Sequence, residues 1–120
     1  MTGKTAIFLF IAIFAVLAGT VAAEELFGIE VYPGAKADPE TTKFLQENLK
    51  VNGAAFRTND PVEKVTDFYK NQPNLKAIGI LDESAVFKKG DSVELTIQNP
   101  WRDMKTSRTN NDTLISIVSQ

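Results

Sequence analysis

Hydrophobic and polar residues follow two rhythms along this chain, and the rhythm changes near Pro73. Before Pro73, apolar residues recur every three or four positions in two segments, which is the spacing of an amphipathic helix. After Pro73, apolar and polar residues alternate, which is the spacing of a strand with one buried face. The pattern therefore predicts helices first and a run of strands afterwards.

The first helical segment spans residues 39–49. Asp38 stands just before it, where a carboxylate can accept hydrogen bonds from free amides of the first turn, and Pro39 suits the first helical position. The apolar residues of this segment gather on one face: Phe44, Leu45 and Leu49. Ahead of this helix, the sequence predicts a short strand that ends in a turn at Pro33 and Gly34.

The second helical segment lies within "TNDPVEKVTDFYKNQP", residues 58–73, and carries start and stop signals. Asp60 can cap the helix, Pro61 suits its first position, and Glu63 follows the cap by three residues, as in a capping box. The apolar stripe of this helix consists of Val62, Val65, Phe68 and Tyr69. A core-facing stripe and a solvated charged face account for this segment without a function.

The remaining segments predict strands and one irregular connection. Extended segments are expected at residues 54–58, 75–81, 84–89, 92–99 and 113–120. The connection at 99–112 is too polar and too rich in turn-forming residues for regular structure. The predicted fold is α+β, with two short helices packed on one face of an antiparallel sheet of four to five strands.

The start of the chain favours export. Lys4 precedes an uncharged run, residues 6–23, that closes on small residues. This pattern predicts a signal peptide at residues 1–23 and a single α+β domain at residues 24–120, periplasmic or secreted and without stable membrane insertion. The alternative is an uncleaved segment that anchors a structural protein of the envelope, because a membrane-spanning helix needs ~18 apolar residues or more.

Two missing residue types exclude several chemistries. The chain contains no histidine and no cysteine, so it lacks a Ser-His-Asp triad, a thiolate nucleophile and the usual ligands of a zinc site. No catalytic residue, metal site or cofactor is therefore predicted. The net charge of −2, without a basic stripe, argues against nucleic acid as a partner.

Carboxylates are the main catalytic groups that remain. A pair of acids can serve a glycosidase, and Asp82 and Glu83 are adjacent in the sequence. Adjacent side chains on a strand point to opposite faces, so a turn is the better place for this pair. A carboxylate-dependent enzyme acting on envelope polysaccharide is therefore kept as the alternative function.

The long connection at residues 99–112 is the candidate binding segment. It combines the only tryptophan with a methionine and cations, which is the composition of an interaction hot spot. The predicted binding residues are Trp101, Arg102, Met104, Lys105 and Arg108. In the alternative, structural interpretation, Trp101 packs on the sheet edge and holds the loop, and the cations are merely solvated.

Two stretches resemble a pattern found in small exported bacterial proteins of unknown function. In that family a Tyr-Pro-Gly-Ala turn precedes a Thr-x-Asp-x-Val-x-x-Val-x-x-Phe-Tyr helix and a meander of strands. The matching residues here are Tyr32, Pro33, Gly34, Ala35, Thr58, Asp60, Val62, Val65, Phe68 and Tyr69. The resemblance implies an exported α+β domain of a bacterium, and it brings no assigned activity and no catalytic residue.

Together these features predict an exported binding or interaction domain without enzymatic activity. Its partner would be a protein or a small ligand in the cell envelope. The open edges of a small sheet are also compatible with a homodimer formed through a sheet edge.

Overall fold

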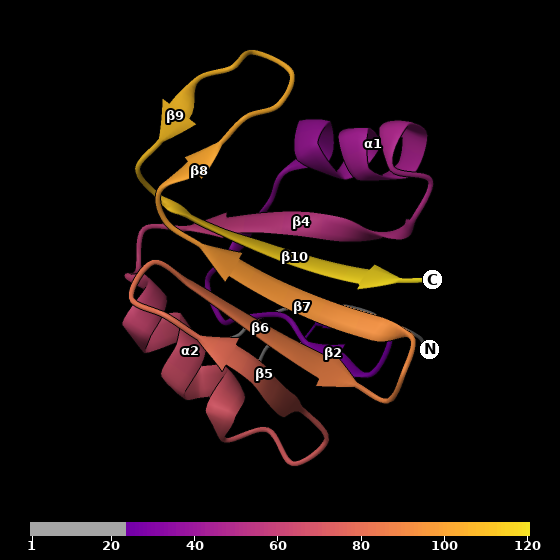
Figure 1. Ribbon diagram of the computed structural model, residues 1–120, viewed down its shortest axis with the longest axis vertical. Helices are drawn as coiled ribbons and strands as arrows, with labels where there is room; N and C mark the ends of the chain where they lie inside the picture. The colour runs from indigo at the N-terminus through magenta and orange to yellow at the C-terminus, as the bar shows by residue number, and fades with distance from the viewer. Residues whose placement is uncertain (1–23) are drawn as a thin grey trace, which may run out of the picture.

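Six antiparallel strands form the central sheet of the computed structural model, which describes residues 24–120 (Figure 1). Their spatial order is β3-β4-β10-β7-β6-β5. The strands are β3 (Lys36–Ala37), β4 (Asn52–Thr58), β5 (Lys76–Ile80), β6 (Ser84–Lys89), β7 (Val93–Gln98) and β10 (Thr113–Ser119). The C-terminal strand β10 pairs with β4 on one side and with β7 on the other, so the last strand of the chain lies in the middle of the sheet.

The α+β class is confirmed, but the prediction of four to five strands was too low. The predicted signal peptide, residues 1–23, lies outside the described residues.

Two short ribbons accompany the sheet. One joins β1 (Glu25–Leu26) to β2 (Ile29–Glu30), and the other joins β8 (Trp101–Arg102) to β9 (Thr109–Asn110). The second ribbon corrects the prediction that residues 99–112 lack regular structure. The polar residues of this segment form the tip of the hairpin, and its arms pair Trp101 with Asn110 and Arg102 with Thr109.

The helices are α1 (Pro39–Asn48) and α2 (Val62–Lys70). The start of α1 is as predicted, because the Asp38 carboxylate accepts a hydrogen bond from the backbone N–H of Thr41 at 3.1 Å. The predicted cap of α2 is wrong. Pro61 occupies the N-cap position, with no side-chain cap, and the Asp60 carboxylate accepts a hydrogen bond from the Tyr32 hydroxyl at 2.6 Å instead. Neither of these helices is long and apolar enough to span a membrane.

The helices lie on opposite faces of the sheet, which corrects the prediction that both cover one face. Ala55 and Phe56 are neighbours on β4 and point to opposite faces, and they belong to different apolar clusters. The cluster of Ala55 includes Leu45 of α1, and the cluster of Phe56 includes the buried residues of α2. Figure 1 shows α1 beside β4 and α2 at the β5 end of the sheet. Both faces of β4 and β10 carry apolar residues, so each face needs a cover.

The main core lies between α2 and the sheet. As predicted, alternate residues of β7 point into it, and the largest fully buried side chains include Tyr69, Phe87, Leu95, Ile97, Ile115 and Ile117. The hydroxyl of Tyr69 donates a hydrogen bond to the backbone carbonyl of Glu30 at 2.8 Å, so this buried polar group is satisfied. Burial raises the pKa of Tyr69 above its ordinary value.

The two halves of the family-like motif meet at the edge of this core. The N–H of Ala35 donates to the carbonyl of Tyr32 at 3.0 Å, and Gly34 has φ 84°, a conformation that favours glycine at this turn position. The turn presents Tyr32 to α2, where its ring packs edge-on against Phe68 with centroids 5.4 Å apart. Burial, followed by the bond to Asp60, raises the pKa of Tyr32 to about 12. Tyr32 therefore joins this turn to the start of α2 and to its apolar stripe.

Candidate functional site

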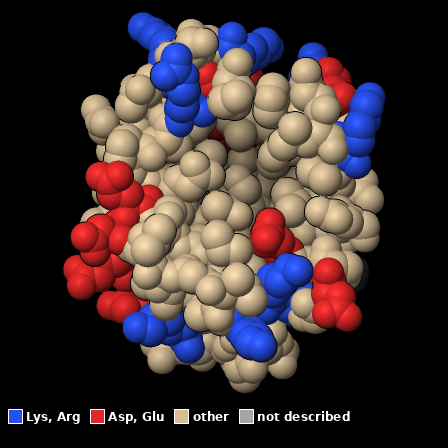
Figure 2. All heavy atoms as spheres, viewed as in Figure 1, with Lys and Arg blue, Asp and Glu red and all other residues tan. Residues whose placement is uncertain are grey.

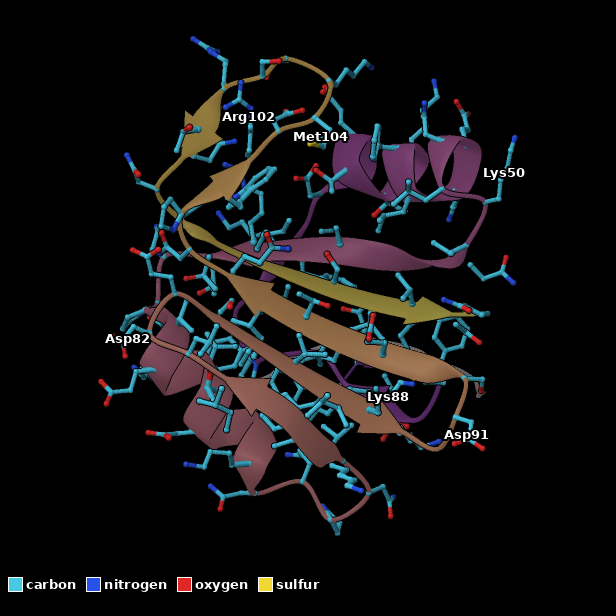
Figure 3. All side chains as sticks on the ribbon, in the orientation of Figure 1. Lys50, Asp82, Lys88, Asp91, Arg102 and Met104 are labelled. Atoms are coloured by element: carbon cyan, nitrogen blue, oxygen red, sulfur yellow. The ribbon has the colours of Figure 1, made fainter. Side chains whose placement is uncertain are left out.

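The predicted binding residues occupy the β8-β9 ribbon but differ sharply in exposure. Trp101 is buried, with 5 % of its surface exposed. Arg102, Met104, Lys105 and Arg108 are exposed, and Met104 keeps 68 % of its surface in solvent. Figure 3 shows Met104 at the ribbon tip, beside α1. Trp101 therefore fixes the ribbon in place, and the exposed residues are the ones available for contact.

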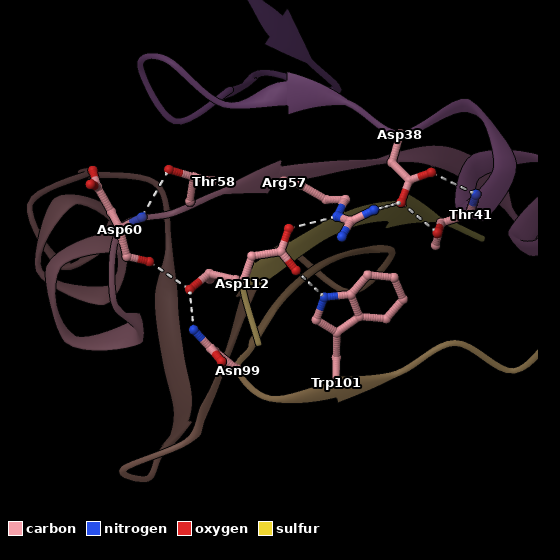
Figure 4. Close-up of polar contacts among 9 residues, drawn as sticks. Asp38, Thr41, Arg57, Thr58, Asp60, Asn99, Trp101 and Asp112 are labelled. Carbon is pink, nitrogen blue, oxygen red and sulfur yellow. Dashed lines mark hydrogen bonds and ion pairs between the residues drawn. The ribbon is translucent and has the colours of Figure 1, made fainter. Parts of the chain in front are cut away.

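Trp101 is held by neighbours that the sequence analysis missed. Its indole N–H donates a hydrogen bond to the Asp112 carboxylate at 3.0 Å, and the guanidinium carbon of Arg57 lies 5.0 Å from the ring centroid (Figure 4). Ala55 and Leu114 complete the buried cluster around the ring. The indole ring thus packs against apolar side chains while its N–H has a hydrogen-bond acceptor, which is the usual arrangement of a buried tryptophan.

Arg57 joins three parts of the chain. Its Nε donates to the Asp112 carboxylate at 2.7 Å, and its Nη1 lies 3.8 Å from the carboxylate of Asp38, the cap of α1 (Figure 4). The third contact is the Trp101 ring. Because Arg57 and Asp112 are 55 positions apart in the chain, no local pattern could pair them.

The Asp112 carboxylate is stabilised by its two hydrogen-bond donors, Arg57 and Trp101. Burial on its own would raise the pKa of the Asp112 carboxyl, but the hydrogen bonds from Arg57 and Trp101 outweigh it and lower the pKa below the ordinary value of 3.8. The bond to Asp112 likewise raises the pKa of Arg57. Asp112 is therefore a stable anion that positions the indole and the guanidinium.

The ribbon tip is closed by a compact turn around Asp103. Its carboxylate accepts hydrogen bonds from the backbone N–H groups of Lys105 at 2.8 Å and Thr106 at 3.3 Å. The backbone N–H of Lys105, followed by that of Thr106, lowers the pKa of Asp103. Asp103 also donates its own N–H to the carbonyl of Arg108 at 2.8 Å. The backbone that bears the exposed cations of the tip is thus fixed by hydrogen bonds.

A cleft of about 280 Å³ opens between the ribbon and α1, and we call it the ribbon cleft. Its apolar lining consists of Phe44, Leu45 and Leu49 of α1 and its C-terminal end, Trp101 and Met104 of the ribbon, and Leu114 of β10. Arg102 and Lys105 stand at its margin, together with Glu40 and Asp103. Figure 2 shows the hollow at this end of the molecule, with largely uncharged walls and Lys and Arg side chains above it.

Acidic residues also lie together in two other places. Asp82 and Glu83 lie exposed in the bend between β5 and β6, the turn position expected for them. A wider, open depression of about 740 Å³ lies beside Arg57, and its acidic lining consists of Asp38, Glu40, Asp60, Asp103 and Asp112. Within residues 24–120, no three side chains of the His, Cys, Asp and Glu types are placed to hold a metal ion. The ribbon cleft is the candidate functional site, because four of the predicted binding residues line it: Trp101, Arg102, Met104 and Lys105.

Comparison of the chain with protein-family models, with curated proteins and with solved structures finds no match. The resemblance to the exported bacterial family stays a prediction. The contacts of Tyr32 with Asp60 and Phe68 give its shared residues a structural role.

Proposed function

We propose that this protein is an exported, non-enzymatic binding domain that captures a segment of a partner protein in its ribbon cleft. The partner would insert one large apolar side chain between α1 and the ribbon and place acidic groups against the cations of the ribbon. Export is supported by the uncharged run at residues 6–23, and the non-enzymatic character by the absence of histidine and cysteine.

The observation that carries the proposal is the exposed apolar surface at the mouth of a firmly held cleft. Met104 and Leu49 are 68 % and 55 % exposed and both line the ribbon cleft. Apolar side chains exposed together around a concavity are typical of an interaction site. The buried Trp101 and its bond to Asp112 hold one wall in place, so little conformational entropy is lost on binding.

The size of the cleft favours an anchoring side chain over a whole ligand. Its volume of about 280 Å³ lies just under the range of roughly 300–1,000 Å³ common for small-molecule pockets. Interfaces between proteins often depend on one apolar anchor in such a pocket, surrounded by a polar rim. Here Arg102 and Lys105 line the cleft together with Glu40 and Asp103, and the adjacent tip adds Arg108. The Asp103 carboxylate already accepts hydrogen bonds from the backbone of the tip, so the ribbon side of the cleft favours an acidic flank on the partner.

Selection from a library of random peptides displayed on phage tests this proposal. We expect enrichment of peptides that carry a large apolar residue next to Asp or Glu. For an enriched peptide, Met104→Asp should weaken binding at least about tenfold, because it places a carboxylate at the apolar mouth beside the acidic peptide. Lys105→Ala should weaken binding a few-fold and reduce its dependence on salt.

Lys50→Ala is the matched control, because Lys50 is an exposed cation that does not line the ribbon cleft and lies at the end of α1 away from Met104 (Figure 3). Its replacement should leave peptide binding unchanged. Thermal melting of each variant shows whether the fold persists. The proposal is wrong if no such peptides are enriched, or if Met104→Asp and Lys50→Ala bind the enriched peptide equally well.

A further inference from the structure

The two edges of the central sheet differ in length and character. The edge strand β3 has two residues, one of them the exposed Lys36, and such a short charged edge offers little to another strand. The opposite edge strand β5 has five residues, all exposed, and its only strand partner within residues 24–120 is β6. Among the described strands, β5 is therefore the edge that can accept a further strand.

Exposed apolar side chains gather along β5 and just beyond it. Ile78, Ile80 and Leu81 are 55 %, 44 % and 71 % exposed. Monomeric proteins usually protect such an edge with charges or cover it. Lys76 lies at the start of this segment and Asp82 just after its end. The segment is thus apolar in the middle and carries opposite charges at its two ends.

Gly79 at the centre of this segment lies at a β-bulge, which is one common reason for a glycine inside a strand. A Cβ atom added there would meet nothing within 4 Å among residues 24–120, and its φ lies outside the range that favours glycine. Glycine within a strand weakens it and often marks a place where another backbone approaches closely. The pairing of β5 with β6 shifts register between Ala77 and Gly79.

We propose that two copies of this chain pair through β5, antiparallel, about a two-fold axis at Gly79. This register sets Ile78 of each copy beside Ile80 of the other, and it brings each Lys76 toward Asp82 of the other copy, in the bend that follows β5. Directly opposed apolar side chains and opposite charges stabilise antiparallel pairs. A two-fold contact must be self-complementary, and this segment meets that condition because its ends differ in sign.

The geometry favours a closed dimer over a growing chain of copies. Growth would need a second long edge, and β3 is too short and too charged to supply one. The register shift also restricts regular pairing to a few residues. Such a contact is small, so we expect a reversible dimer in a concentration-dependent equilibrium with the monomer. The ribbon cleft lies on α1 and the ribbon, away from this edge, and stays open in the dimer.

Sedimentation equilibrium over a range of concentrations, on protein produced from the full-length chain, tests the proposal. The wild type should show a monomer–dimer equilibrium. Ile78→Lys should raise the dissociation constant at least about tenfold, because the two-fold axis removes two apolar pairs at once. Lys76→Asp should raise it about fivefold, and the double variant Lys76→Asp with Asp82→Lys should restore it.

Leu49→Lys is the control for general stickiness, because Leu49 is also 55 % exposed but lies at the end of α1. It should leave the dissociation constant unchanged, and circular dichroism should show the same fold for every variant. A wild type that stays monomeric at all concentrations overturns the proposal. So does a dimer that Ile78→Lys and Leu49→Lys weaken equally, or one that the double charge exchange fails to restore.

Discussion

The two faces of the central sheet differ in how they are covered. The face toward α2 is sealed, and α2 itself buries Val62, Val65, Thr66 and Tyr69. The face toward α1 is covered thinly, because α1 has no buried residue and its apolar cluster comprises Ala55, Trp101 and Leu114 with the partly exposed Leu45. The same strands serve both faces. In β10, Ile115 and Ile117 point to the sealed face while Leu114 points to the open one.

This difference separates stability from recognition within one small domain. The sealed face buries most of the large side chains and should dominate the free energy of unfolding. The open face leaves apolar surface around the ribbon cleft and depends on a few polar contacts to hold its walls. A thin cover costs some stability but keeps a concave surface accessible.

The largest expected loss of stability comes from a substitution on the sealed face, the one covered by α2. Phe87 is fully buried and packs near Tyr69, with ring centroids 6.3 Å apart. Phe87→Ala should lower the free energy of unfolding by about 3–5 kcal/mol, because it leaves a cavity in a packed core. Leu45→Ala on the open face should cost only about 1 kcal/mol, because Leu45 is partly exposed. Urea denaturation measures both, and equal costs would contradict the distinction between the faces.

The next effect concerns the anchor of the open face. Trp101→Ala should lower the free energy of unfolding by about 3 kcal/mol, because it removes a buried ring and leaves Asp112 with one fewer partner. Trp101→Phe should cost less, about 1–2 kcal/mol, since a ring remains but the indole N–H is lost. Thermal melting distinguishes these from Met104→Ala, which should change stability by less than about 0.5 kcal/mol at an exposed site. A Trp101→Ala variant as stable as the wild type would show that the indole does not hold the ribbon.

A smaller change in stability is expected at alkaline pH, and it concerns Tyr32 at the edge of the sealed face. The pKa of Tyr32 is raised to about 12 from 10.0, so its stabilising contribution is complete below pH 10 and is lost as the pH rises to about 12. Tyr32→Phe should cost about 1 kcal/mol at pH 7, through loss of the bond to Asp60. The difference between wild type and variant should shrink above pH 10 in denaturation experiments. A difference that stays constant would exclude this titration as its source.

The smallest change in stability is expected at acidic pH, and it concerns Asp112 on the open face. The pKa of Asp112 lies below its ordinary value of 3.8, so its contribution is complete above that pH and is lost as the pH falls further. Asp112→Asn should cost about 0.5–1 kcal/mol at pH 7, a modest amount because the Arg57 side chain is 39 % exposed. Stability measured from pH 7 to pH 2 should show the gap between wild type and Asp112→Asn closing below pH 3.8. A gap that widens would mean that another group controls the acid response.

Local patterns predicted the elements well because their causes are local. Alternation in β7 and the pairing of Asp38 with the start of α1 depend on neighbours a few positions away. The cap of α2 was predicted wrongly because Tyr32, 28 positions from Asp60, takes the carboxylate. Likewise Trp101 was identified from its residue type, but its partners Arg57 and Asp112 come together only when β4 and β10 pair.

The amino-acid sequence by itself determined the α+β class, the extent of α1 and most strands, and the absence of histidine and cysteine chemistry, since spacing and residue types decide these. The tertiary structure alone decided that α1 and α2 lie on opposite faces, that the ribbon and α1 enclose a cleft, and that β5 is an edge strand of the sheet formed by the described residues. Strand order is responsible for these features. The strand order depends on which distant segments bury the most apolar surface together, and it cannot be read from the periodicity of residues along the chain.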